Sequence, residues 1–185
     1  MAAMGWGFKV LWRSLLVAAA VVVLVACETI GYYGQAAQGQ MSLLFNRESI
    51  QELINEDSVS PEVRNKLTAV LEIRKFADDV LFLPVGDAYL SYVDLDREHV
   101  VWNVFAAPEF SIDPLNWCYP IAGCVSYRGY FSEDRATKFA TKLEDEGYDV
   151  YTGGVDAYST LGWFEDPLLS TVINRSEHQL AGLTY

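Results

Sequence analysis

The sequence predicts an α+β fold in which N-terminal helices pack on a small mixed β-sheet. Up to about residue 86, apolar residues recur at helical spacing, whereas alternating or continuous apolar runs typical of strands dominate from residue 87 onward. Signals for helix starts also reappear between those runs. We therefore expect a helical segment over residues 27–86 and an α+β segment over residues 87–185.

A lipoprotein export signal precedes this fold. Lys9 and Arg13 form a cationic segment, residues 15–25 form an apolar core, and Leu24-Val25-Ala26-Cys27 matches a lipobox. A membrane-spanning helix needs roughly 20 apolar residues, so the shorter run suits a signal peptide over residues 1–26. Cleavage before Cys27 would leave its thiol acylated and anchored in a lipid bilayer. An uncleaved signal anchor, or a secreted protein in which Cys27 is incidental, are the alternatives.

The charge of the mature chain limits its partners. The whole chain has a formal net charge of −12, and losing Lys9 and Arg13 with the signal would bring residues 27–185 to −14. Such an acidic surface argues against nucleic acid, whose phosphates need Lys and Arg. It would also repel anionic lipid, so membrane attachment should come from the acyl chains. We expect a location in the bacterial cell envelope, facing the periplasm, and Glu28 after the lipid cysteine slightly favours the outer membrane.

The mature chain should begin with helices. Residues 31–44 are expected to form one just after the anchor, and Ile50, Leu53 and Ile54 have the i, i+3, i+4 spacing of a short amphipathic helix. A stronger signal follows, with Ser60 as N-cap before Pro61. That helix should run from residue 61 to about residue 80.

Strands should follow in the second segment. Their predicted ranges are residues 89–93, 100–107, 125–131, 148–151 and, as a short edge strand, 156–163.

Further helices and one turn should separate these strands. Ser132 should cap a helix that Gly147 ends, and Gly153-Gly154 should form a turn. A short helix should run from Pro167 to Ile173, and a last one should start at Ser176. Its apolar residues Leu180 and Leu183 would lack a completed element to pack against.

Two cysteines remain once Cys27 is acylated. Cys118 and Cys124 flank a segment whose Pro120 and Gly123 favour a turn, and export places them in an oxidising compartment. We predict a disulfide, with two reduced, buried thiols as the alternative. A zinc site is disfavoured because no histidine or second cysteine pair completes a tetrahedron.

The sequence contains no recognisable set of catalytic residues. Its two histidines, His99 and His178, do not stand in an H-E-x-x-H motif, and both are expected to lie partly exposed on the surface. Neither a G-x-S-x-G elbow nor a phosphate-binding loop is present.

Aromatic residues are concentrated in three runs, residues 102–110, 117–120 and 158–164. They would suit either core packing or a groove for a peptide or a sugar. Glu109 and Asp166 are the acids nearest to these runs, and Trp163 and Glu109 are our candidates for a cleft.

These runs also carry a family likeness. Residues 100–110, 117–131 and 153–164, together with Thr29-Ile30-Gly31-Tyr32-Tyr33, resemble the bacterial predicted-aminopeptidase lipoprotein family, whose members are described as zinc metallopeptidases of the zincin type. The likeness extends from about residue 24 to the last residue. It implies that residues 27–185 form a truncated aminopeptidase-like domain, the front part of a zincin-like domain.

The resemblance implies hydrolysis of peptide N-termini with zinc as the cofactor. In the family, an H-E-x-x-H helix follows the segment similar to residues 176–185, so no catalytic residue, cofactor-binding residue or metal ligand can be assigned here, and we expect this chain to be inactive. The lipidation of Cys27 and the disulfide between Cys118 and Cys124 do carry over. A non-catalytic envelope lipoprotein that binds peptide or glycan is the alternative function.

By analogy with zincins, an edge strand should pair with the extended peptide substrate. Our candidates for that strand are Ala157, Tyr158, Ser159, Thr160, Leu161 and Gly162.

Overall fold

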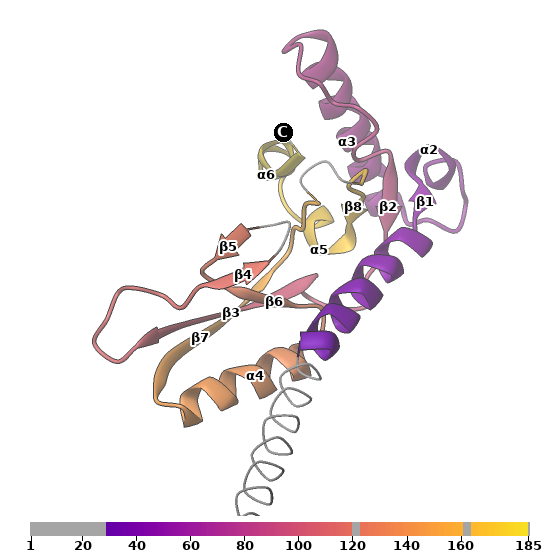
Figure 1. Cartoon of the computed structure of the whole chain (residues 1–185). Coiled ribbons are helices and arrows are strands. Elements are labelled where there is room, and N and C mark those ends of the chain that lie inside the picture. The colour runs from indigo at the N-terminus through magenta and orange to yellow at the C-terminus, as the bar shows by residue number, and fades with distance from the viewer. Residues whose placement is uncertain (1–28, 120–122, 161–163, 185) are drawn as a thin grey trace, which may run out of the picture. The chain divides into compact units, whose positions relative to one another are not determined.

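The structure is a computed structural model that describes residues 29–119, 123–160 and 164–184 (Figure 1). Its contacts define two compact units, one ending at Gln40 and one from Met41 to Tyr185. Residues 29–45 are helical, as expected for the start of the mature chain. The predicted signal peptide and Cys27 lie outside the described residues. No helix in the described ranges is both long and apolar enough to cross a membrane.

Local start signals define the first helices of the second unit. Helix α2 (Ile50–Leu53) is short, and α3 (Pro61–Asp79) begins where Ser60 and Pro61 predict it. The Ser60 hydroxyl accepts a hydrogen bond from the Val63 N–H at 3.3 Å, a cap that typically stabilises a helix by about 1 kcal/mol. Three side chains of α3 are buried on one side, Leu67, Val70 and Ala77.

A small mixed sheet lies beside these helices. It has the order β1 (Glu48–Ser49), β2 (Ser91–Val93) and β8 (Leu168–Leu169), with β1 antiparallel and β8 parallel to β2. The predicted helix from Pro167 to Ile173 is therefore shorter than expected. Its first part pairs with β2 as β8, and only α5 (Ser170–Ile173) is helical.

The last helix, α6 (Glu177–Thr184), packs into the core of the second unit, contrary to our expectation for Leu180. Leu180 is 0% exposed and belongs to the cluster that contains Leu67 and Val70 of α3. The Leu183 side chain lies outside the description. The start predicted at Ser176 is confirmed, because its hydroxyl accepts from the Gln179 N–H and the Gln179 side chain accepts from the Ser176 N–H.

A second sheet forms from three antiparallel strands, in the order β6 (Arg128–Tyr130), β3 (Val101–Pro108) and β7 (Tyr148–Val155). Helix α4 (Glu133–Asp145) packs against it through three buried side chains, Ala136, Ala140 and Leu143 (Figure 1). The helix starts after Ser132 as predicted, although Ser132 makes no side-chain capping bond. Together these elements confirm the mixed α+β fold.

The turn expected at Gly153-Gly154 is wrong. Both glycines lie inside β7 and pair with Asn103 and Trp102 of β3. A glycine within a strand often marks a close approach by another group. Here the Tyr151 ring covers the space beside Gly153, and the His99 ring covers the space beside Gly154.

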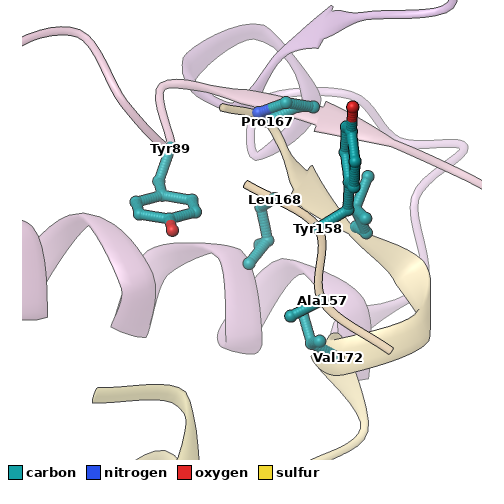
Figure 2. A pocket seen from close by; sticks show the side chains of 7 residues that line it. Tyr89, Ala157, Tyr158, Pro167, Leu168 and Val172 are labelled. Carbon is teal, nitrogen blue, oxygen red and sulfur yellow. The ribbon is translucent and has the colours of Figure 1, made fainter. Parts of the chain in front are cut away.

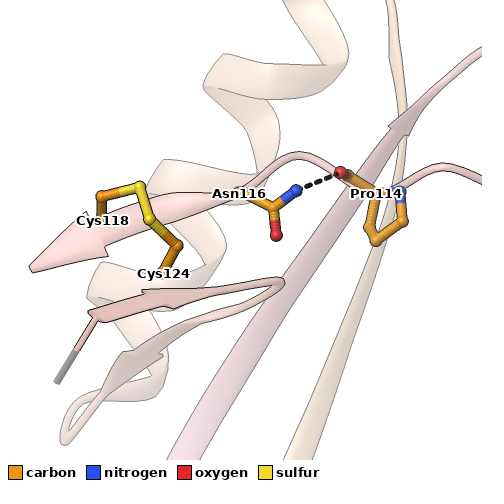
Figure 3. Close-up of a disulfide and its surroundings, with 4 residues drawn as sticks. All are labelled: Pro114, Asn116, Cys118 and Cys124. Carbon is orange, nitrogen blue, oxygen red and sulfur yellow. Dashed lines mark hydrogen bonds between the residues drawn. A yellow bond between two sulfur atoms is a disulfide. The ribbon is translucent and has the colours of Figure 1, made fainter.

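The predicted disulfide is present, between Cys118 of β4 (Trp117–Tyr119) and Cys124 of β5 (Gly123–Val125) (Figure 3). The two cysteines face each other in the antiparallel register of this two-stranded ribbon. Just before it, the Asn116 side-chain amide donates to the Pro114 carbonyl at 3.3 Å.

The single strand predicted over residues 125–131 is divided in two. Its first part belongs to β5, which pairs with β4, and its second part is β6, which pairs with β3. The chain leaves one sheet and joins another between Ser126 and Tyr127, so one uninterrupted strand cannot form.

Candidate functional site

A polar hollow of about 500 Å³ is lined entirely by residues that the structure describes. Its walls come from three segments that are distant in the sequence: residues 94–99 after β2, Asp156 after β7, and residues 170–175 in and after α5. The volume falls in the range of about 300–1,000 Å³ that small-molecule sites usually occupy.

Hydrogen bonds of Ser170 and the neighbouring backbone fix these walls. The Ser170 hydroxyl accepts from the Leu95 N–H at 2.8 Å and donates to the Leu95 carbonyl at 3.2 Å. The parallel pairing of β2 with β8 brings the two segments together just before this contact. The Val100 N–H donates to the Val155 carbonyl at 2.9 Å, which aligns the third wall.

Asp156 connects the walls of the hollow. Its carboxylate accepts from His99 Nδ1 at 2.7 Å and from the Arg175 guanidinium, and its main-chain carbonyl accepts from the Thr171 hydroxyl at 2.5 Å. Burial opposes ionisation of this carboxyl, but the hydrogen bonds from His99 and Arg175 outweigh burial and lower the pKa of Asp156. Asp156 is therefore an ionised carboxylate at neutral pH, and its contacts join the segment after β7 to the other two segments that line the hollow.

The His99 ring is enclosed from several sides. It packs edge-on against Trp102, with ring centroids 6.0 Å apart, and lies directly over Gly154. A Cβ atom at position 154 would lie only 2.0 Å from His99 Cδ2. With Nδ1 donating to Asp156, the neutral imidazole keeps Nε2 as an acceptor.

Arg97 provides a second fixed cation in the lining. Its guanidinium donates to the Phe131 carbonyl at 2.7 Å and to the Val100 carbonyl at 3.1 Å, and it lies 5.9 Å from the Trp102 ring centroid. Burial lowers the pKa of Arg97. Within the described part of the chain, Arg97 has no carboxylate partner.

The lining of the hollow carries charged side chains of both signs but no activated nucleophile. The two hydroxyls in the lining, those of Ser170 and Thr171, are already engaged by main-chain atoms, so neither is held as a nucleophile beside His99. Among the described residues, no three His, Cys, Asp or Glu side chains are grouped to hold a metal ion.

A second, apolar pocket of about 20 Å³ lies near β8 and α5 (Figure 2). Figure 2 shows the side chains of Tyr89, Leu168 and Val172 around it. Its volume is close to the minimum that a single water molecule needs, so it has no room for a large side chain. Burial, with the nearby charge of Asp166, raises the pKa of Tyr89.

The expected strand over residues 156–163 is not formed at Ala157 to Thr160. The Thr160 N–H and hydroxyl both donate to the Asp166 carboxylate, at 3.0 and 2.7 Å, and the Ser159 hydroxyl does so at 2.8 Å. Such local side-chain bonds compete with the ladder of a sheet. Ala157 and Tyr158 line the small pocket, while Leu161, Gly162 and Trp163 lie outside the described residues.

Glu109 is not brought close to Ala157. It follows Pro108, which pairs with Tyr148 at one end of β7, whereas the segment at Ala157 follows Val155 at the other end. At about 3.3 Å per residue, the two ends of this strand are about 23 Å apart. A cleft shared by Glu109 and Trp163 stays a prediction.

The structure brings together at the hollow residues that the sequence did not link, although His99 is partly exposed, as expected. His99 and Asp156 are 57 positions apart, and Arg175 is 19 positions beyond Asp156. One local signal was present, because Gly154 inside a run of strand-forming residues indicates a close approach. The prediction of a turn at Gly153-Gly154 missed this close approach.

Comparisons with known proteins point to one family. The family model described as Putative aminopeptidase matches residues 31–185. Neither the curated proteins nor the solved structures give a match.

Proposed function

This chain belongs to the Putative aminopeptidase family, and we propose that it forms one part of a lipid-anchored zinc aminopeptidase. In this proposal, the part formed by these 185 residues does not hold the zinc. Such an enzyme removes residues from peptide N-termini, so its substrates are peptides. The observation that carries the proposal is the family match, which covers nearly all of the chain after Cys27.

The absence of a zinc motif from the sequence sets the limit of this proposal. A catalytic zinc site needs three protein ligands and an open position, and zincins take two of those ligands from H-E-x-x-H. This sequence has two histidines, His99 and His178, and neither stands in that motif. The ligands and the general base would have to come from residues outside these 185.

The described geometry is compatible with a role in recognising peptides. The polar hollow around Asp156 offers both positive and negative side chains, Arg97 and Arg175 on one hand and Asp94 and Glu98 on the other. An aminopeptidase must recognise the charged end of its substrate, and a preformed polar site supplies such groups.

A hydrolysis assay tests the proposal. The purified 185-residue chain is incubated with aminoacyl p-nitroanilides, with and without added Zn²⁺, beside an authentic zinc aminopeptidase as positive control. We expect no zinc-dependent release of nitroaniline, because without ligands there is no Lewis acid to lower the pKa of a bound water. Zinc-dependent turnover by this chain would contradict the proposal that the zinc ligands lie outside these 185 residues.

A further inference from the structure

We propose that the polar hollow binds a small zwitterion, a free α-amino acid or a short peptide, with its carboxylate near Arg97 and Arg175 and its ammonium near Asp94 and Glu98. The presence of both charges in the ligand is inferred from the lining. The choice of amino acids and peptides among zwitterions rests on the proposed function.

The argument begins with Arg97, a cation fixed in place without an acid. Two main-chain carbonyls and the Trp102 ring hold its guanidinium, and no described carboxylate neutralises it. Arg64 and Arg74 are likewise held by main-chain carbonyls, but Arg97 lines the polar hollow, where a ligand can reach its guanidinium. An anionic group of a ligand would supply the missing partner, since guanidinium groups bind carboxylates well.

Arg175 adds a second cation to the same hollow. It shares the Asp156 carboxylate with His99, so Asp156 is already satisfied by two donors and does not need a further cation. Five N–H groups are available on a guanidinium. The bond to Asp156 therefore leaves donors on Arg175 for a ligand.

Asp94 and Glu98 supply the opposite charge. Both line the hollow, and neither side chain makes a hydrogen bond or an ion pair with another residue in the described ranges. A ligand with several negative charges would be repelled by them, and a purely cationic ligand would be repelled by Arg97 and Arg175. A ligand that carries one charge of each sign satisfies both walls.

Size supports the same class of ligand. The hollow of about 500 Å³ is within the range of small-molecule sites, and its lining is polar, so it suits the main chain of an amino acid or a dipeptide better than a large apolar side chain.

The first test measures binding of L-alanyl-L-alanine to the full 185-residue chain by calorimetry and saturation-transfer NMR. Two matched ligands each lack one charge: the N-acetylated dipeptide has no ammonium, and the dipeptide amide has no carboxylate. We expect each to bind about tenfold more weakly than the zwitterion, the effect of losing one charged hydrogen bond. Equal binding of either analogue, or no binding of the dipeptide at about 10 mM, would overturn the proposal.

Variants of the acidic wall provide the second test. The double variant Asp94→Asn with Glu98→Gln should bind the dipeptide about tenfold more weakly and leave the N-acetylated analogue unaffected. The double variant Glu144→Gln with Asp145→Asn, which removes the same two charges from the exposed end of α4, is the control and should change neither. Unchanged dipeptide binding in the double variant would contradict the placement of the ammonium.

The Arg97→Gln variant tests the other wall, with thermal unfolding as a check that the fold survives. We expect it to weaken binding of the dipeptide and leave binding of the dipeptide amide unaffected. An equal loss of affinity for both ligands would contradict the placement of the carboxylate. Chromatography confirms that the dipeptide stays intact during the titration. Failure of binding is thus distinguishable from failure of the proposed function, which would appear as zinc-dependent hydrolysis.

Discussion

Gly154 determines how closely the His99 ring can lie to strand β7. Any side chain at this position would meet the imidazole, and the imidazole in turn donates to Asp156, which joins the walls of the hollow. The lack of a Cβ atom at Gly154 therefore affects the position of the His99 ring, the ion pair between Asp156 and Arg175, and the segment of residues 94–99.

Replacing Gly154 with Ala should disturb all three. Because the new Cβ would lie 2.0 Å from His99 Cδ2, the ring has to move, and overpacking of this kind costs about 1–3 kcal/mol of unfolding free energy. Urea unfolding measures this cost, and the ¹⁵N shifts of the His99 imidazole report loss of the Asp156 bond. Gly182→Ala in α6 is the matched control and should be neutral or slightly stabilising, because beyond its own helix backbone and chain neighbours the added Cβ would meet no atom within 4 Å. Equal effects of the two variants would contradict this account of Gly154.

Asp156 should make stability depend on acid pH. Its pKa in the folded chain is lowered, so its carboxylate contributes stability above the unfolded pKa of about 4, and that contribution is lost as the pH falls through the folded pKa. Asp156→Asn should destabilise the chain by about 1–3 kcal/mol at neutral pH, because His99 and Arg175 lose a charged acceptor.

The difference between wild type and Asp156→Asn should shrink as the pH falls below about 4. Urea unfolding at pH 7 and at acid pH measures it. Asp149→Asn, on the exposed side of the same strand, serves as control and should change stability by less than about 0.5 kcal/mol. A constant difference at both pH values would show that the Asp156 charge does not contribute.

At the scale of elements, the signals that predict correctly are local. Ser60 and Pro61 mark the start of α3, and Ser176 marks the start of α6, because a cap involves residues only three positions apart. The errors concern long-range pairing. β8 replaces the first turn of a predicted helix because β2 lies beside it, and Thr160 leaves a predicted strand because Asp166 binds it. The candidate site depends on similar long-range contacts, so it could not be predicted.

Helix α6 is expected to contribute to the stability of the second unit through Leu180. Leu180 is 0% exposed, so Leu180→Ala should cost about 2–5 kcal/mol in thermal or urea unfolding. Leu81→Ala makes the same chemical change at a position that is 52% exposed, and it should cost less than about 0.5 kcal/mol. If the two variants unfold alike, α6 does not pack as described.

At the scale of the whole molecule, charge and acylation should together decide where the chain resides. With a formal net charge of −12, the whole chain has little attraction for anionic lipid, so the proposed attachment to a bilayer would have to come from acyl chains at Cys27. Two or three such chains bury enough methylene groups for stable anchoring, at about 0.8 kcal/mol for each CH₂.

The variant Cys27→Ser should therefore lack the acyl anchor. Mass spectrometry and detergent-phase partition of the mature chains, residues 27–185, measure this, and we expect acylated wild type in the detergent phase and unacylated Cys27→Ser in the aqueous phase. The matched control replaces both disulfide cysteines, Cys118 and Cys124, and should still partition with detergent. If mass spectrometry finds no acyl group on the wild-type chain, the proposed anchor is wrong.

The parallel contact between β2 and β8 also has a kinetic consequence. Val93 pairs with Leu169, so the intervening chain, which contains the whole β6-β3-β7 sheet, must close as one long loop. Contacts so distant in sequence form late, after local hairpins and helices, because the loop-closure entropy is lost before the contact is gained. Since Leu95 and Ser170 meet only when that loop has closed, ligand capacity should be among the last properties to return during refolding.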